Sequence, residues 1–210
     1  MEPVWIQAAL DAEDIEPAKQ VARMALDYGA QWLEVGTPLL YRYGHGAIGE
    51  IRRAAGKDAL LVADYKCPIA RLCAKQAAEE GANFLLLTTV YNEELEQDNV
   101  TYSRSLGLEP IFHLSGKPED FYKEAKKLEG MGAKYLFTHR YSRLEDGTRQ
   151  DNLRVLKESC SCKIGITSDD LEEAADSVRQ GADWITFGVV LRQYNPTEAK
   201  KWMETIRTAR

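Results

Sequence analysis

Gly29-Ala30-Gln31-Trp32-Leu33-Glu34-Val35 is the stretch that decides the fold, because its pattern returns three more times along the chain. The returns begin at Gly81-Ala82, Gly132-Ala133 and Gly181-Ala182, at spacings of 52, 51 and 49 residues. Glycine can end a helix because it adopts the left-handed backbone conformation without a Cβ clash. The short apolar run after each pair is typical of a buried parallel strand. Each repeat therefore has room for two strand–helix units.

The remaining apolar runs complete a set of eight strands. We expect them at residues 4–9, 32–35, 59–63, 84–87, 110–114, 135–137, 163–166 and 184–187. Amphipathic helical stretches alternate with them, for example at 15–28, 69–80, 118–131 and 171–180. Eight alternating units with a fourfold pseudo-repeat predict an α/β fold, a (β/α)8 TIM barrel that forms a single domain over residues 1–210. An open doubly wound sheet is the alternative, but no glycine-rich dinucleotide fingerprint follows any predicted strand.

Length and composition agree with an ordinary globular domain. The chain has 210 residues, near the lower end of the roughly 200 to 400 residues of such barrels. Its net charge of −6 gives no basic surface for nucleic acid. No apolar run approaches the ~18 residues that span a membrane, and the N-terminus lacks the basic region of a signal peptide. The four cysteines show no zinc or redox spacing, so we expect free thiols and a cytoplasmic protein.

Polar residues gather at the predicted strand ends, where barrel enzymes place their chemistry. Strands avoid acidic residues, and a buried unpaired charge is costly, so these groups should be paired or bind a metal. An active site is therefore favoured over structural ion pairs, although Asp11 could instead cap the following helix and His113 could be a core histidine. The residues are Asp11, Glu34, Asp64, Lys66, His113, His139, Arg140, Thr167 and Gly188, with Arg143 further out. The segment 141–150 is expected to be a loop over the barrel mouth.

Several segments resemble the orotidine-monophosphate-decarboxylase superfamily, on the branch of 3-hexulose-6-phosphate synthase and 3-keto-L-gulonate-6-phosphate decarboxylase. Ala9-Leu10-Asp11 and Leu33-Glu34-Val35-Gly36-Thr37-Pro38 resemble the first two strands of that branch. Ala63-Asp64-Tyr65-Lys66 resembles the start of the superfamily's Asp-x-Lys-x-x-Asp motif. Thr138-His139-Arg140, followed by Ser142-Arg143, is similar to the sixth strand of the decarboxylase.

This resemblance implies roles for the residues. Glu34 and Asp64 would hold a Mg²⁺ ion, which prefers oxygen ligands. Lys66 would stabilise an enediolate or deliver a proton, and Asp11 would bind substrate hydroxyls. The metal would stabilise the enediolate as a Lewis acid. The resemblance also implies a homodimer with sites at the interface.

Further residues of the sixth, seventh and eighth loops are candidates for substrate contacts. His139 and Arg143 would act in proton transfer or near the distal carbons of the substrate. The full set of candidate substrate-binding residues is Asp11, His113, Arg140, Arg143, Thr167, Gly188 and Arg192.

The sequence departs from the family pattern at three places. Ile69 stands where the second Asp of the motif is expected, and His113 stands where the decarboxylase has an acid. At the phosphate site, Thr167-Ser168-Asp169-Asp170 replaces a glycine pair and Gly188-Val189 replaces Gly-Arg, although Arg192 could substitute. Two acids would repel a phosphate dianion and could cap the following helix instead. We infer that the metal and enediolate machinery remains while the phosphate end of the substrate is shortened, absent or bound differently.

Three functional hypotheses follow. The first is a metal-dependent carbon–carbon lyase, either an aldolase or a decarboxylase, acting through an enediolate on a sugar or sugar-phosphate-like substrate. The second is a sugar epimerase or isomerase that uses acid–base pairs such as Asp11 with Lys66 or His113. The third is a non-catalytic barrel that binds a ligand or a partner, because fold similarity alone does not establish function.

Overall fold

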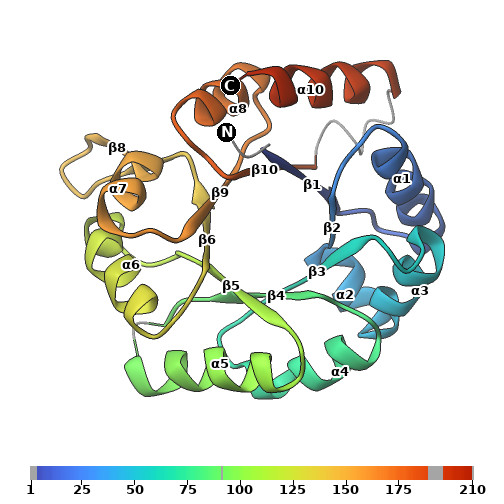
Figure 1. Ribbon diagram of the computed structural model, residues 1–210, viewed down its shortest axis with the longest axis horizontal. Coiled ribbons are helices and arrows are strands. Elements are labelled where there is room, and N and C mark those ends of the chain that lie inside the picture. The colour runs from blue at the N-terminus through green and yellow to red at the C-terminus, as the bar shows by residue number, and fades with distance from the viewer. Residues whose placement is uncertain (1–3, 91, 189–195, 210) are drawn as a thin grey trace.

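Eight parallel strands close into a barrel in the computed structural model, which describes residues 4–90, 92–188 and 196–209. The order around the barrel is β1-β10-β9-β6-β5-β4-β3-β2, and the helices form an outer ring around it (Figure 1). The predicted single-domain (β/α)8 barrel is confirmed. The strands are β1 Trp5–Leu10, β2 Trp32–Val35, β3 Leu60–Cys67, β4 Phe84–Thr88, β5 Glu109–His113, β6 Tyr135–His139, β9 Lys163–Thr167 and β10 Trp184–Phe187.

The helices connect successive strands over the outside of the barrel. They are α1 Ile15–Asp27, α2 Thr37–Tyr43, α3 Gly46–Ala55, α4 Ala74–Glu79, α5 Glu93–Ser105, α6 Phe121–Gly130, α7 Asn152–Ser159, α8 Leu171–Arg179 and α10 Pro196–Thr208. Two short 3-10 turns, η1 Ala70–Leu72 and η2 Pro118–Asp120, precede α4 and α6. Among the described residues, no helix is long and apolar enough to cross a membrane.

The four repeat glycines do what the sequence predicts. Gly29, Gly81, Gly132 and Gly181 have φ values of +95°, +91°, +88° and +96°. The alanine after each glycine donates its backbone N–H to a carbonyl five residues earlier, at 2.9 Å in every case, as in Ala30 to Ala25. This double turn closes the helix and directs the chain into the next strand.

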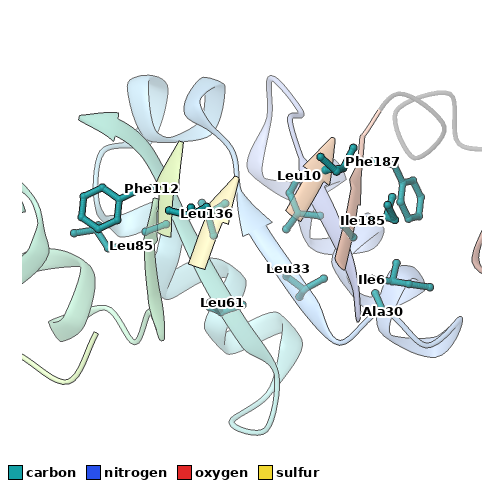
Figure 2. Packing of buried hydrophobic residues seen from close by; sticks show 14 of the residues in the cluster. Ile6, Leu10, Ala30, Leu33, Leu61, Leu85, Phe112, Leu136, Ile185 and Phe187 are labelled. Atoms are coloured by element: carbon teal, nitrogen blue, oxygen red, sulfur yellow. The ribbon is translucent and has the colours of Figure 1, made fainter. Parts of the chain in front are cut away.

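Alternate residues of each strand face two different cores. Outward side chains pack between strands and helices, and Figure 2 shows part of this layer, with Leu33, Leu61 and Phe112 among the labelled residues. Inward side chains form a second cluster within the barrel: Trp32, Val62, Phe84, Leu86, Ile111, Phe137 and Trp184. The Trp32 and Trp184 rings lie 5.3 Å apart, and both are almost fully buried. An aromatic floor therefore closes the lower part of the barrel.

Two predicted elements are corrected by the structure. The segment expected to be a loop over the mouth contains an antiparallel hairpin, β7 Tyr141–Arg143 and β8 Arg149–Asp151. The helix expected at 69–80 is broken, and its regular part begins only at Ala74. The cause is Asn99 on α5, whose side chain accepts from the Ala70 N–H and donates to the Pro68 carbonyl, both at 2.8 Å. The four cysteines are free thiols, as expected.

Candidate active site

A pocket of about 130 Å³ opens at the carboxyl ends of the barrel strands. It brings together seven of the residues that the sequence analysis singled out. They are Asp11, Glu34, Lys66, His113, His139, Thr167 and Gly188. Their convergence follows from the fold, because inward positions at the ends of parallel barrel strands meet at one mouth.

Asp64 and Lys66 form the charged centre of this region. Asp64 is buried, and its Oδ2 accepts hydrogen bonds from Lys66 Nζ at 2.6 Å and from Thr37 Oγ1 at 3.0 Å. Its other oxygen, Oδ1, is buried without a hydrogen-bond partner among the described residues. The Lys66 side chain is 43% exposed and lines the pocket, whereas Asp64 lies behind the residues of the lining that are described. One oxygen of Asp64 therefore remains for a ligand.

A bulge in β3 positions Lys66. The pairing of β3 with β4 shifts between Asp64 and Cys67, so that Asp64 pairs with Leu86 but Cys67 with Leu87. Within the bulge Lys66 has φ +46°, and it is the one non-glycine residue with a positive φ among those described. Such a conformation costs on the order of 1–3 kcal/mol, and residues that adopt it cluster at functional sites. The pairing of β3 with β4 on either side of the bulge therefore holds Lys66 in this conformation.

Glu34 lies beside this pair on β2 and is almost fully buried. Its carboxyl group accepts a hydrogen bond from the side-chain amide of Gln7. Burial, and then repulsion from the Asp64 carboxylate, raise the pKa of Glu34 well above its ordinary value, although Lys66 opposes the change. Two carboxylates and a single lysine thus share a poorly solvated corner of the barrel, which favours binding of a proton or a cation.

Asp11 reaches the pocket because two glycines leave room for it. A Cβ on Gly36 would lie 2.1 Å from Asp11 Oδ1, and one on Gly188 would lie 3.3 Å from Oδ2. Helix α1 instead has Asp14 at its N-cap position. The structure thus places Asp11 at the mouth and not at the start of the helix.

Two imidazoles form the opposite side of the pocket. The rings of His113 and His139 lie 6.4 Å apart, and Phe137 lies beneath His113 at 5.6 Å. Burial, then electrostatic repulsion from the neighbouring Lys66 and His139 side chains, lower the pKa of His113 to about 4. His113 is therefore neutral near pH 7 and can exchange hydrogen bonds without adding charge.

Arg140 does not face the pocket, which corrects its expected role in substrate binding. Its guanidinium is buried outside the barrel, where it contacts Asp151 at 2.8 Å, Asp176 at 3.3 Å and Ser177 at 3.2 Å. Strand alternation explains the error, because His139 points inward and its neighbour must point outward.

The other two expected arginines are also absent from the described pocket lining. Arg143 lies on the β7–β8 hairpin, opposite Arg149, and not among the residues that line the mouth. Arg192 lies outside the described residues. The expected cationic contacts to a substrate phosphate are therefore not part of the described site.

Sequence reasoning missed two polar contributors, Gln7 and Thr186. Gln7 donates a hydrogen bond to Glu34, and Thr186 lines the pocket. Period-two alternation could have found both, because Gln7 shares an inward face with Asp11, and Thr186 lies between Trp184 and Gly188.

The donor set suits Mg²⁺ better than a softer metal. No cluster of three or more His, Cys, Asp or Glu side chains able to hold a metal occurs among the described residues. Mg²⁺, however, is commonly held by one or two carboxylates, with waters and substrate oxygens completing its shell. The unpartnered Oδ1 of Asp64 and the carboxylate of Glu34 supply such a pair. The residues present therefore fit this ion.

Comparison with known proteins agrees with this picture. The chain is 25% identical to 3-hexulose-6-phosphate synthase of Staphylococcus aureus over 211 residues, covering 93% of this chain and 95% of that protein. It is 23% identical over 194 residues to the bifunctional enzyme Fae/Hps of Methanoregula boonei, covering 89% of this chain but only 48% of that enzyme. The chain thus spans about half the length of that relative.

Solved structures share the fold. The structure of 3-hexulose-6-phosphate synthase from Salmonella typhimurium superimposes with a TM-score of 0.84 at 20% identity, covering 99% of this chain and 100% of that one. Structures of 3-keto-L-gulonate-6-phosphate decarboxylases are similar as well. The model of the family described as Orotidine 5'-phosphate decarboxylase / HUMPS matches residues 5–201. The chain therefore belongs to the orotidine 5'-phosphate decarboxylase / HUMPS family, as the resemblance of its segments implied.

Proposed function

We propose that this barrel is a Mg²⁺-dependent carbon–carbon lyase that forms an enediolate from a sugar-like substrate. The observation that carries the proposal is the Asp64–Lys66 contact of 2.6 Å, formed beside Glu34 at the edge of one pocket. It combines two possible oxygen ligands with one ammonium group, which is what an enediolate intermediate requires. The 3-hexulose-6-phosphate synthase relative supports the same reaction class.

Glu34 and Asp64 would hold the ion, the latter through Oδ1. When bound, Mg²⁺ would supply Lewis-acid stabilisation of the negative charge on the substrate oxygens. Gln7 and Thr37 orient the two carboxylates by hydrogen bonds. Such supporting contacts fix the ligand geometry before the ion arrives.

Lys66 is the proton donor in this proposal. Burial alone would lower its pKa, but the Asp64 carboxylate more than offsets that effect and leaves the pKa above its ordinary value. Lys66 is therefore an ammonium ion at neutral pH. In a decarboxylation, the electrons of the breaking carbon–carbon bond enter the carbonyl to give the enediolate as CO₂ leaves, and Lys66 returns a proton to carbon. In an aldol reaction, neutral His113 would first take the proton from the carbon beside the carbonyl, which gives the enediolate. The enediolate carbon would then attack the aldehyde carbon, and Lys66 would donate a proton to the aldehyde oxygen.

Asp11, His113 and His139 would bind and orient the substrate hydroxyls. All three line the pocket with Lys66. Neutral His113 can accept or donate a hydrogen bond, and its buried Nδ1 has no partner among the described residues. These contacts would fix which carbon faces Lys66.

The test is Mg²⁺ binding followed by proton exchange. Calorimetry would be performed on the wild type, Glu34→Gln and Asp64→Asn, with Glu109→Gln as the control, because Glu109 pairs with Arg104 and Lys134 at the other end of the barrel. We expect binding that is lost in both site variants and kept in the control. NMR in D₂O would then follow exchange beside the carbonyl of pentuloses and their phosphates.

The outcomes separate the three hypotheses. Exchange together with carbon–carbon cleavage supports the lyase. Exchange that inverts or moves the carbonyl without cleavage identifies an isomerase or epimerase. Absence of Mg²⁺ binding in the wild type overturns the proposal and leaves a barrel that binds a ligand or a partner.

A homodimer is proposed as its working state. The two most exposed large hydrophobic side chains among the described residues are Tyr41 on α2, at 85%, and Leu72 on η1, at 65%. Burial of such side chains against a second copy would stabilise a dimer. Light scattering on the wild type and on Leu72→Glu tests this, and a monomeric wild type refutes it.

A further inference from the structure

Lys66 keeps a left-handed backbone conformation within the β3 bulge, with φ +46°. A non-glycine residue holds such a conformation only where the surrounding structure enforces it. On its N-terminal side, Thr37 Oγ1 lies 3.0 Å from both the backbone carbonyl oxygen and the Oδ2 of Asp64. On its C-terminal side, the pairing of β3 with β4 ends at Cys67, which pairs with Leu87. The chain that follows Cys67 therefore needs another anchor.

Asn99 on α5 supplies that anchor. Its side chain is fully buried, its Nδ2 donates to the Pro68 carbonyl, and its Oδ1 accepts from the Ala70 N–H, both at 2.8 Å. Pro68 has no N–H of its own, so the strand cannot continue as a regular ladder through this position. Because both polar ends of one amide bind backbone groups two residues apart, they fix the shape of this segment.

Helix α5 also contacts the segment from the solvent side, but more weakly. Arg71 forms an ion pair with Asp98 at 2.6 Å, and its guanidinium lies 4.4 Å from the centroid of the Tyr102 ring. Exposed ion pairs contribute little to stability, because water solvates the two groups nearly as well. Ala70 is fully buried, so its N–H would lose its hydrogen bond outright without Asn99. The Asn99 contacts are therefore the stronger restraint.

We propose that Asn99 is a positioning residue that holds the backbone after the bulge, enforces the positive φ of Lys66, and so sets the 2.6 Å contact between Lys66 Nζ and Asp64 Oδ2. Asn99 is not among the described residues that line the pocket, so it acts through Lys66. The inference rests on the proposed function in one respect, since Lys66 is the proton donor there. Loss of both Asn99 hydrogen bonds should let Lys66 return to the extended backbone that strands favour.

The test observes the Lys66 backbone directly by NMR. At a positive φ the amide proton lies closer to Hα than at a negative φ, so the NOE between these two protons is stronger. In the wild type, the NOE of Lys66 should exceed those of Tyr65 and Cys67, which do not have a positive φ. This excess should disappear in Asn99→Ala. Asn99→Leu removes the same hydrogen bonds without leaving a cavity, so it serves if the alanine variant folds poorly.

Asn83→Ala is the matched control. Asn83 precedes β4 at the opposite end of the barrel, where its Oδ1 accepts from the Leu61 N–H at 2.9 Å and from Arg52 Nη2 at 2.8 Å. This variant also loses two hydrogen bonds of one asparagine, one of them with the β3 backbone. It should lower the free energy of unfolding and leave the NOE of Lys66 unchanged.

A second measurement follows proton exchange of D-ribulose 5-phosphate in D₂O with Mg²⁺ present. Asn99→Ala should lower the maximal exchange rate by roughly tenfold or more, because even a small displacement of a catalytic group is costly. The sugar concentration that gives half the maximal rate should change little, because the other residues that line the pocket are untouched. Asn83→Ala should change neither quantity.

Three results would overturn the inference. They are an NOE of Lys66 that stays strong in both Asn99 variants, an equal loss of this NOE in Asn83→Ala, and a lost NOE that leaves the exchange rate unchanged. Failure of the proposed function is a separate outcome. If the wild type catalyses no exchange, that function loses its support, whereas the NMR comparison still decides whether Asn99 sets the conformation of Lys66.

Discussion

Replacement of His113 by glutamine should make the free energy of unfolding of the barrel less sensitive to acid. The His113 imidazole is buried at the mouth, and burial lowers its pKa from an ordinary 6.5 to about 4. The unfolded chain takes up a proton on this residue as the pH falls through 6.5, whereas the folded protein resists it until about pH 4. Stability is therefore lost as the pH falls within this window.

The size of the effect follows from the two pKa values. One pKa unit corresponds to about 1.36 kcal/mol, so the interval from 6.5 to about 4 amounts to about 3 kcal/mol in full. At pH 5 the proton uptake of the unfolded state accounts for about 2 kcal/mol of this. Near pH 8 the contribution vanishes, because the imidazole is neutral in both states.

Urea unfolding followed by circular dichroism would measure the term for the wild type and for His113→Gln at pH 8, 6 and 5. The difference between the proteins should shift by about 2 kcal/mol from pH 8 to pH 5, in favour of the variant. Other titrating groups contribute equally to both proteins and cancel. NMR titration gives a direct check, since the chain has only three histidines. A constant difference across this range, or an imidazole of His113 that titrates near 6.5, would refute the reasoning.

Three further predictions concern stability. The Gly165→Ala substitution should lower the free energy of unfolding by about 3 kcal/mol, because the new Cβ would lie 1.9 Å from the buried Trp184 ring. Adding Trp184→Leu should recover part of this loss, and a double-mutant cycle measured by urea unfolding would test it. The Glu34→Gln variant should be more stable than the metal-free wild type, and the difference in stability should grow from pH 5 to pH 8. The reason is that burial raises the pKa of Glu34, so deprotonation of this residue costs folding free energy as the pH rises. Thermal melts that show no such growth would contradict this. The Arg140→Ala substitution should destabilise the protein by about 2 kcal/mol, because it removes the contacts of this arginine with two aspartates. Arg143→Ala should change stability by less than about 0.5 kcal/mol. Equal losses for the two variants in chemical unfolding would contradict the structural difference between these arginines.

The barrel could be predicted from sequence because its signals are local. Each repeat glycine ends a helix through its own backbone conformation, so residues near Gly29 or Gly181 suffice to locate a strand. The two strands at Trp32–Val35 and Trp184–Phe187 match the expected bounds. The β7–β8 hairpin was missed because its polar, charged sequence carries no alternating apolar pattern.

For the candidate site, the sequence could predict which strand ends contribute residues to the mouth of the barrel, but not how each side chain is oriented. Strand-end position was enough for Glu34 and Lys66. It was not enough for Arg140, which directly follows β6 and points outward because the last strand residue, His139, points inward. The bulge that turns Lys66 toward Asp64 depends on the pairing of β3 with β4. The sequence of β3 alone therefore does not predict it. The break at residue 69 similarly depends on Asn99, thirty residues later in the chain.

Inward-facing side chains are apolar in the lower part of the barrel and polar at its mouth, and this change in polarity links the fold to the proposed chemistry. Trp32 precedes Glu34 on β2, and Trp184 precedes Thr186 on β10, so an aromatic floor lies directly beneath the polar mouth. Because that floor is apolar and buried, it disfavours charge, and burial is the main cause that shifts Glu34 and His113 toward their neutral forms. The Asp64 carboxylate offsets the effect of burial on Lys66 and leaves the pKa of that ammonium group above its ordinary value. In the proposed function, a bound cation would offset the effect of burial and would lower the pKa of Glu34 toward its ordinary value, so the burial that disfavours the Glu34 carboxylate in the empty barrel is the effect that a metal ion would relieve.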